Sequence, residues 1–443
     1  MLGDDKDEDA EIEPADESAI THANPLTSYT PRQLANMQAT ILGMTQQASG
    51  VIGAQAAGVI GAQAAGVIVA RVAGIVNRLG LGTVPSVSAQ YTRFAEQWAS
   101  LTLASDYAKP DPPQGTYSAQ MTSPGSYFES DEVEIDSVDD LHHAITTLIE
   151  KTPELPLVWR GVRDANWGMH SHLFRHLMGI NGVVSPDKNP VGKQPYPDED
   201  QMVAAERVIL RLARTTWRFD DFSALETFAR IQHAGGPTRL LDVTKNPYVG
   251  AWFAVEADPK TEDKPARLFA LATRPVVKDD KPAPPDSTLQ LDEVGDLRDP
   301  FWHALESPSD RQLLDWGTGA RRRVWVPPAY DPRISAQNAA FILDGVPITS
   351  EKTASSFRIE HNLYWRRADL LAASSIYAKM HSPKRKPRYN KRNFAPTFSF
   401  RITANAKPKI REFMESRFGY GLSYIYPDMA ALAAHLNTLD LSD

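Results

Sequence analysis

The sequence predicts an α+β domain that fills most of the chain, from about residue 130 to residue 443. Short apolar runs typical of strands are mixed with amphipathic helical patterns, without the strict alternation that a parallel sheet requires. Nine Trp, fourteen Tyr and sixteen Phe supply enough large apolar side chains for a sizeable core. The chain has no cysteine, which excludes disulfides, thiolate nucleophiles and cysteine-bound zinc.

The expected elements of this domain follow one another along the chain. Apolar runs predict strands at residues 133–135, 157–159, 267–272, 324–326, 339–343 and 397–402. Apolar residues at helical spacing predict helices at residues 141–150 (capped by Ser137), 202–219, 223–233 and 407–418. A further helix is expected to begin at Asn246 and Pro247, with Ala251, Phe253 and Ala254 packed inward. Two stretches rich in proline and charge, 275–297 and 379–396, are expected to be long loops.

The first 35 residues are expected to form an acidic, disordered tail. Residues 1–17 hold nine acidic side chains and one lysine, which accounts for the whole net charge of −8. Like charges at this density repel one another and stay solvated. An interaction tail is the functional alternative.

Residues 36–80 form an apolar repeat. The octad Gly-Val-Ile-Gly-Ala-Gln-Ala-Ala at 50–57 recurs identically at 58–65 and approximately at 66–73. No charged side chain occurs in residues 33–70, so the run is long enough to cross a bilayer as a helix, which takes about 20 residues. Three interpretations remain open: a membrane-associated or oligomerising helix, a buried helix of the soluble fold, and a low-complexity linker.

The repeat also indicates a location and partners. We expect a membrane, or a second copy of the chain, to bind through residues 36–80. In the membrane interpretation residues 48–70 associate with the inner membrane. Arg71 and Arg78 follow this run and place the large domain in the cytoplasm by the positive-inside rule. Residues 81–129 are expected to hold one helix and a linker rich in Pro, Ser and Gly.

Four blocks of the large domain resemble the FRG domain family. They are Val-Trp-Arg-Gly at 158–161 with Asn-Trp at 166–167 and Leu-Phe-Arg at 173–175; residues 232–247 with Ala-Trp-Phe-Ala at 251–254; Arg333 with Gln337 and Phe341; and the closing segment from 410 to 432. The resemblance covers about residues 130–437, and the N-terminal repeat lies outside it. It implies an effector of bacterial and phage conflict, of the antiviral-defence or toxin type.

The polar residues of these blocks form the candidate site. We predict a catalytic set of Arg160, His233, Arg239, Asp242 and Gln337. We predict that Gly161, Thr238, Thr244, Asn246 and Arg333 bind the ligand. An arginine presents a two-pronged donor that suits phosphate, and a histidine can serve as a base near neutral pH. Two structural alternatives remain open: Arg160 paired with Asp242 in the core, and His233 capping the end of its helix.

The order of these residues resembles that of the ADP-ribosyltransferases. In those enzymes an arginine on an early strand holds NAD, a strand with Ser or Thr leads into a helix, and a late Glu or Gln lies by the nicotinamide ribose. The resemblance implies an ADP-ribosyltransferase-like fold that cleaves the N-glycosidic bond of NAD. Arg160 would bind the pyrophosphate, Thr244 the ribose, and Gln337 the ribose hydroxyl. NAD is thus the expected nucleotide substrate, with no other cofactor. Gln337 departs from the usual transferase glutamate.

The competing interpretations are a metal site, nucleic-acid binding and ligand sensing. His170, His172 and His176 lie close together, but no acidic residue is among them, and no metal is predicted. The basic runs 321–323 and 379–392 are expected to be solvated, so nucleic acid is not an expected partner. The non-catalytic alternative is a module that senses a nucleotide and passes the signal to the N-terminal repeat.

Overall fold

The computed structural model describes residues 115–192, 194–277, 297–348, 351–359, 363–389 and 392–437. The acidic tail, the repeat and the helix expected in the region 81–114 lie outside these residues. Within the described ranges, every helix is too short or too polar to span a bilayer.

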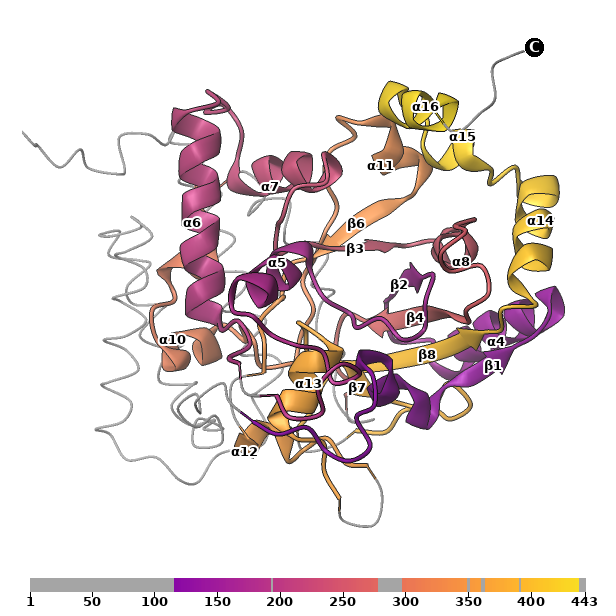
Figure 1. Ribbon diagram of the computed structural model, residues 1–443, viewed down its shortest axis with the longest axis horizontal. Helices are drawn as coiled ribbons and strands as arrows, with labels where there is room; N and C mark the ends of the chain where they lie inside the picture. Colours follow the sequence, from indigo (N-terminus) through magenta and orange to yellow (C-terminus); the bar gives the residue numbers. More distant parts are fainter. Residues whose placement is uncertain are drawn as a thin grey trace, which may run out of the picture.

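An eight-stranded sheet organises the described part of the chain (Figure 1). The strand order is β1-β8-β4-β2-β3-β6-β5, and β7 pairs with β8 off this path. The strands are β1 Val133–Ile135, β2 Leu157–Val162, β3 Leu241–Thr244, β4 Ala266–Ala272, β5 Val324–Trp325, β6 Ala339–Ile342, β7 Lys379–Met380 and β8 Pro396–Ile402. Strands β1 and β7 run parallel to β8, and the other described pairs are antiparallel. The predicted α+β class is therefore confirmed.

Helices surround this sheet. The longer ones are α4 Val138–Lys151, α5 His172–Ile180, α6 Glu199–Thr215, α7 Ala224–His233, α8 Pro247–Val255, α13 Arg367–Ala373, α14 Lys407–Phe418 and α16 Met429–Leu436. The shorter ones are η3 Pro124–Asp131, η4 Phe301–Ala304, α10 Pro308–Leu313, α11 Pro332–Ala336, α12 Glu351–Ala354 and α15 Leu422–Ile425. Helix α8 packs against β2 and β4, and α14 packs against α8 and α4. In Figure 1, α6 and α10 lie at one end of the sheet and α4 and α14 at the other.

The predicted strands and helices are present with shifted ends. The helix predicted at 202–219 begins at Glu199, because the side chain of Asp198 accepts the backbone N–H of Gln201 as an N-cap. Sequence analysis missed β3, α5 and α13, and it missed β7 inside the predicted loop at 379–396. Phe253 on α8 packs against the core but is only half-buried, because it also lines a cavity.

The packed part of the chain begins before the predicted boundary at residue 130. Tyr117 and Tyr127 are buried in the same apolar cluster as residues of the sheet. The hydroxyl of Tyr127 donates to the carbonyl oxygen of Ala378 at 2.6 Å. The interpretation of residues 115–129 as part of a linker is therefore wrong. Its polar composition hid buried aromatic side chains that join this segment to the core.

Gly161 lets helix α8 lie close against strand β2. A Cβ at Gly161 would lie 2.1 Å from the carbonyl oxygen of Gly250 and 2.5 Å from the backbone nitrogen of Ala254. Any side chain at this position would push the helix away from the strand. Gly161 therefore sets the position of α8, whose end carries part of the cavity wall.

Candidate functional site

The sheet opens between β2 and β3, and a cavity lies at this opening. Strand β2 pairs with β4 over six residues but with β3 through the single pair Trp159 and Thr244 in the described sheet. The cavity has a volume of about 1100 Å³ and is lined by both strands, by β6 and by helices α7, α8 and α11. The residues of the predicted site that line it are Arg160, Gly161, His233, Asp242, Thr244, Arg333 and Gln337.

Arg160 reaches from β2 across the opening toward β3. Its Nη1 donates to the carbonyl oxygen of Asp242 at 2.6 Å and lies 3.8 Å from the carboxylate of the same residue. Burial lowers the pKa of Arg160, although the charge of Asp242 acts in the opposite direction. The Nε of Arg160 has no hydrogen-bond partner among the described residues. Of the alternative that pairs Arg160 with Asp242 in the core, the contact is present, but both residues line the cavity.

Arg175 on α5 is a second guanidinium group in this cavity, and sequence analysis did not assign it to the site. Its Nη1 donates to the carbonyl oxygen of His170 at 2.6 Å. Burial lowers the pKa of Arg175, as does the nearby positive charge of Arg160, while Asp242 raises it. The Asp242 carboxylate is 58% exposed and accepts a hydrogen bond from Gln232 at 2.9 Å. Asp242 contacts Arg160 and acts on Arg175 through its charge, so two guanidinium groups lie near one solvated carboxylate.

His233, Thr244 and Gln337 contribute a further part of the wall. His233 ends α7, and its Nδ1 lies 3.4 Å from the carboxylate of Asp331. The hydroxyl of Thr244 donates to the carbonyl oxygen of Gln337 at 2.7 Å. The side-chain amide of Gln337 donates to the carbonyl oxygen of Ile425 at 2.9 Å. Gln337 thus lies at the cavity, but its amide nitrogen holds the C-terminal segment in place.

Arg333 joins the cavity wall to the C-terminal segment. Its Nε and Nη2 both contact the Asp428 carboxylate, the second at 2.7 Å. The guanidinium carbon lies 5.1 Å from the ring centre of Tyr426. Hydrogen bonding to Arg333 lowers the pKa of Asp428 to about 2. Because a carboxylate already engages it at two nitrogens, Arg333 is less suited than Arg160 to hold an anionic ligand.

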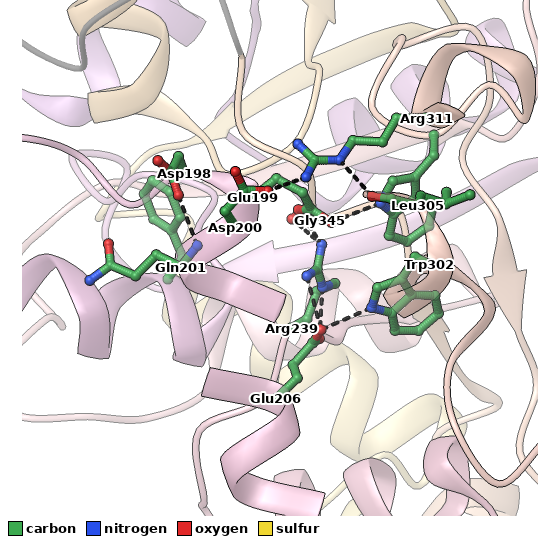
Figure 2. A network of polar contacts seen from close by, with 12 residues as sticks. Asp198, Glu199, Asp200, Gln201, Glu206, Arg239, Trp302, Leu305, Arg311 and Gly345 are labelled. Carbon is green, nitrogen blue, oxygen red and sulfur yellow. Dashed lines mark hydrogen bonds and ion pairs between the residues drawn. The ribbon is translucent and has the colours of Figure 1, made fainter. Parts of the chain in front are cut away.

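Arg239 lies in the core, within the network of polar contacts drawn in Figure 2. It is not among the residues that line the cavity. Its side chain is fully buried, and its nitrogens lie 2.6 Å from the carboxylate of Glu199 and 2.7 Å from that of Glu206. The indole N–H of Trp302 donates to Glu206 at 2.9 Å, and that of Trp316 donates to Glu199 at 2.8 Å. The prediction that Arg239 is catalytic is therefore wrong. Two carboxylates of α6 neutralise it, and it ties α6 to the chain that leads into β3.

Thr238 and Asn246 also fall outside the cavity lining. Thr238 is fully buried, and its hydroxyl donates to the side chain of Gln232 at 2.6 Å. The Asn246 side chain caps α8 by accepting the backbone N–H of Tyr248 at 2.9 Å, and it donates to the hydroxyl of Tyr420 at 3.0 Å. The structure places neither side chain at the cavity. Thr238 positions Gln232, which contacts Asp242, and Asn246 begins the helix.

One carboxylate of the cavity escaped sequence analysis. Glu256 follows the last residue of α8, and its Oε2 lies 3.2 Å from Nη1 of Arg163. The hydroxyl of Tyr426 donates a hydrogen bond to the same carboxylate, and all three side chains line the cavity. Burial raises the pKa of Glu256. The signal available in the sequence was its place as the first charged residue after an apolar helix.

The fold and the cavity define an α+β domain with a basic cleft at an opening in its sheet. Residues 156–263 match the family model of the FRG domain, and the chain carries an FRG domain. The matched segment begins at β2, ends in the loop after α8, and includes Arg160, Arg175 and Glu256. Elements on both sides of the match, such as β1 before it and β8 after it, complete the sheet. No curated protein and no solved structure matches the chain.

Proposed function

We propose that the cavity binds a phosphate-bearing nucleotide, NAD in particular. The FRG domain would act on it as an NAD glycohydrolase or an ADP-ribosyltransferase-like enzyme. The observation that carries this proposal is the pair of guanidinium groups on Arg160 and Arg175. They come from different elements and line the same cavity; Arg160 lies 3.8 Å from the carboxylate of Asp242, and the charges of Arg160 and Asp242 both act on the pKa of Arg175. A pyrophosphate would neutralise both charges through charge-assisted hydrogen bonds.

The size and the walls of the cavity suit a dinucleotide. Its volume of about 1100 Å³ lies at the upper end of small-molecule sites, which measure roughly 300–1,000 Å³. Aromatic side chains line it, among them Trp167, Tyr330 and Tyr426. Trp167 is 44% exposed. An exposed indole in a pocket offers a flat surface on which a base or a nicotinamide ring can stack.

The order of the lining residues supports NAD as the nucleotide. Arg160 on β2, Thr244 at the end of β3 and Gln337 before β6 line the same cavity. This is the order that resembles the ADP-ribosyltransferases. In this proposal Arg160 binds the pyrophosphate, and Thr244 and Gln337 lie beside the nicotinamide ribose. The amide nitrogen of Gln337 is engaged by Ile425, so its side-chain oxygen is the atom that would accept a ribose hydroxyl.

The resemblance to the FRG domain family implies an effector role in bacterial and phage conflict. Consumption of NAD would be a way to carry out that role. Loss of NAD stops the metabolism of a cell and with it the replication of a phage. An antiviral-defence or toxin function is therefore part of the proposal. Association with a membrane or a second copy through residues 36–80, with the FRG domain in the cytoplasm, also stays a prediction.

Ligand sensing without turnover is the second candidate, and one observation favours it. The contacts of Arg333 with Asp428 and of Gln337 with Ile425 tie the cavity wall to the segment of α15 and α16. A ligand that displaces either contact would shift this segment. The N-terminal repeat, which this alternative makes the receiver of the signal, lies outside the described residues.

Calorimetric titration of the full-length chain with a ligand series tests the proposal. NAD and ADP-ribose are expected to bind, and nicotinamide riboside is expected to bind at least about 10-fold more weakly. The riboside lacks the pyrophosphate, and a hydrogen bond to a charged group contributes roughly 1.5–3 kcal/mol. Equal affinities for ADP-ribose and the riboside, or no binding of either NAD or ADP-ribose, would contradict the proposed function.

A further inference from the structure

Glu256 is a carboxylate of the cavity wall that can serve as a general base. Hydrolysis of a glycosidic bond needs a group that accepts a proton from the attacking water. In the predicted set this role would fall to His233, which lines the cavity and whose Nδ1 lies 3.4 Å from the carboxylate of Asp331. Gln337 carries an amide, which is not a base, and its nitrogen is engaged by Ile425.

Asp242 lies beside Arg160 at the proposed phosphate position, is largely solvated, and is held by Gln232. Two further carboxylates line the cavity: Asp164, which is paired with Lys264 at 3.0 Å, and Asp187, which is exposed. Glu256 is the cavity carboxylate that accepts a hydrogen bond from Tyr426 of the aromatic wall.

The surroundings of Glu256 fix its carboxylate at the cavity. It lies at the end of α8, which Gly161 allows to pack closely against β2. Three charged or titratable groups face it: Arg163 after β2, Asp258 in the loop after α8, and Tyr426 between α15 and α16. The side chain is 19% exposed, so it can be reached from the cavity without being freely solvated.

The spacing along β2 separates the two ends of the cleft. Arg160 and Arg163 are three residues apart in or next to an extended strand, a distance of roughly 10 Å. Arg160 holds the proposed phosphate position, and Arg163 contacts Glu256 at 3.2 Å. Because Arg160 and Glu256 line the same cavity, a ligand whose pyrophosphate lies at Arg160 has room to place one of its riboses beside Glu256.

We propose that Glu256 is the general base of an NAD glycohydrolase reaction in this cleft, an inference that rests on the proposed binding of NAD. Water attacks C1′ of the ribose that carries nicotinamide. The bond from C1′ to the ring nitrogen breaks, and its electron pair goes to nicotinamide, which leaves as a neutral molecule. The water gives its proton to the Glu256 carboxylate, which later releases it to solvent. The products are ADP-ribose, nicotinamide and one proton. Tyr426 and Arg163 are positioning residues that hold the carboxylate.

The test compares NAD binding and nicotinamide release for the full-length chain and its variants. Glu256→Gln is expected to keep the Kd for NAD and to lose roughly 100- to 10,000-fold in kcat, the usual contribution of a general base. Glu256→Asp keeps a carboxylate and is expected to retain part of the activity. Glu262→Gln is the matched control, because Glu262 is also ion-paired to an arginine, Arg411, but does not line the cavity.

The pH dependence of kcat distinguishes a general base from a residue with a purely structural role. Burial raises the pKa of Glu256, and the base works in its ionised form, so the wild-type kcat is expected to rise with pH through that pKa. The rise is expected to vanish in Glu256→Gln. Turnover of NAD by Glu256→Gln at the wild-type rate would overturn the assignment. So would a wild type that binds NAD and releases no nicotinamide, although nucleotide binding would then stand. Failure to bind NAD would overturn the proposed function itself.

Discussion

Replacing Arg239 with methionine is expected to lower the free energy of unfolding by about 3–5 kcal/mol, the usual cost of breaking a buried ion pair. Methionine keeps an unbranched side chain but removes the positive charge. The carboxylates of Glu199 and Glu206 would then remain buried in the network of Figure 2 without their cation. Total stabilities of single domains are about 5–15 kcal/mol, so the variant is expected to be largely unfolded or strongly destabilised.

Urea unfolding followed by tryptophan fluorescence measures this effect, because Trp302 and Trp316 donate to the two carboxylates. The control is Arg211→Met, an exposed position on α6, which is expected to change the free energy of unfolding by less than about 0.5 kcal/mol. If Arg239→Met unfolds at the wild-type urea concentration, the network does not stabilise the fold.

Replacing Arg160 with alanine is expected to weaken ADP-ribose binding roughly 10- to 100-fold, because a hydrogen bond to a charged group contributes about 1.5–3 kcal/mol. Arg175→Ala is expected to have an effect of the same order, since both guanidinium groups would face the pyrophosphate. The fold is expected to persist in each variant. Arg160 and Arg175 each make one hydrogen bond to a backbone carbonyl, and both side chains lie in the cavity wall rather than in the core.

Calorimetric titration of the two variants with ADP-ribose gives the ratio of affinities directly. Arg211→Ala removes an arginine from the exposed face of α6 and serves as the charge-matched control, with an unchanged Kd expected. Wild-type affinity in both Arg160→Ala and Arg175→Ala would show that the phosphate lies elsewhere or that the ligand carries none.

The strands predicted from sequence are those whose apolar residues form local runs. β4 is buried at every position and most of β8 is buried, so their composition alone reveals them. β3 has four residues and includes Asp242 and Thr244, which leaves no apolar run to detect. It forms a strand because β2 and β6 flank it, and that information lies far away in the sequence.

The site residues likewise divide into those predicted correctly from the local sequence and those whose position depends on distant partners. Arg160, His233 and Asp242 were assigned to one site and do line one cavity. Arg239 was misassigned because its partners, Glu199 and Glu206, lie 40 and 33 residues earlier in the chain. No local pattern distinguishes an arginine with buried partners from one that faces a ligand.

Arg175 and Glu256 line the cavity, but sequence analysis did not predict this. Each lies on or next to a helix, α5 or α8, where a charged residue is ordinarily solvated. Both line the cavity, and Glu256 reaches it because α8 packs against β2, which Gly161 allows. Gly161 can be read from the sequence, but the close packing of α8 against β2 that it allows becomes visible in the structure.

The central claim is that the opening between β2 and β3 holds a nucleotide by its phosphates. A crystal structure of the full-length chain with ADP-ribose tests it most directly. We expect the pyrophosphate within hydrogen-bond distance of both Arg160 and Arg175, and a ribose beside Glu256. A structure with ADP-ribose bound at another place, and water alone between the two arginines, would contradict the account.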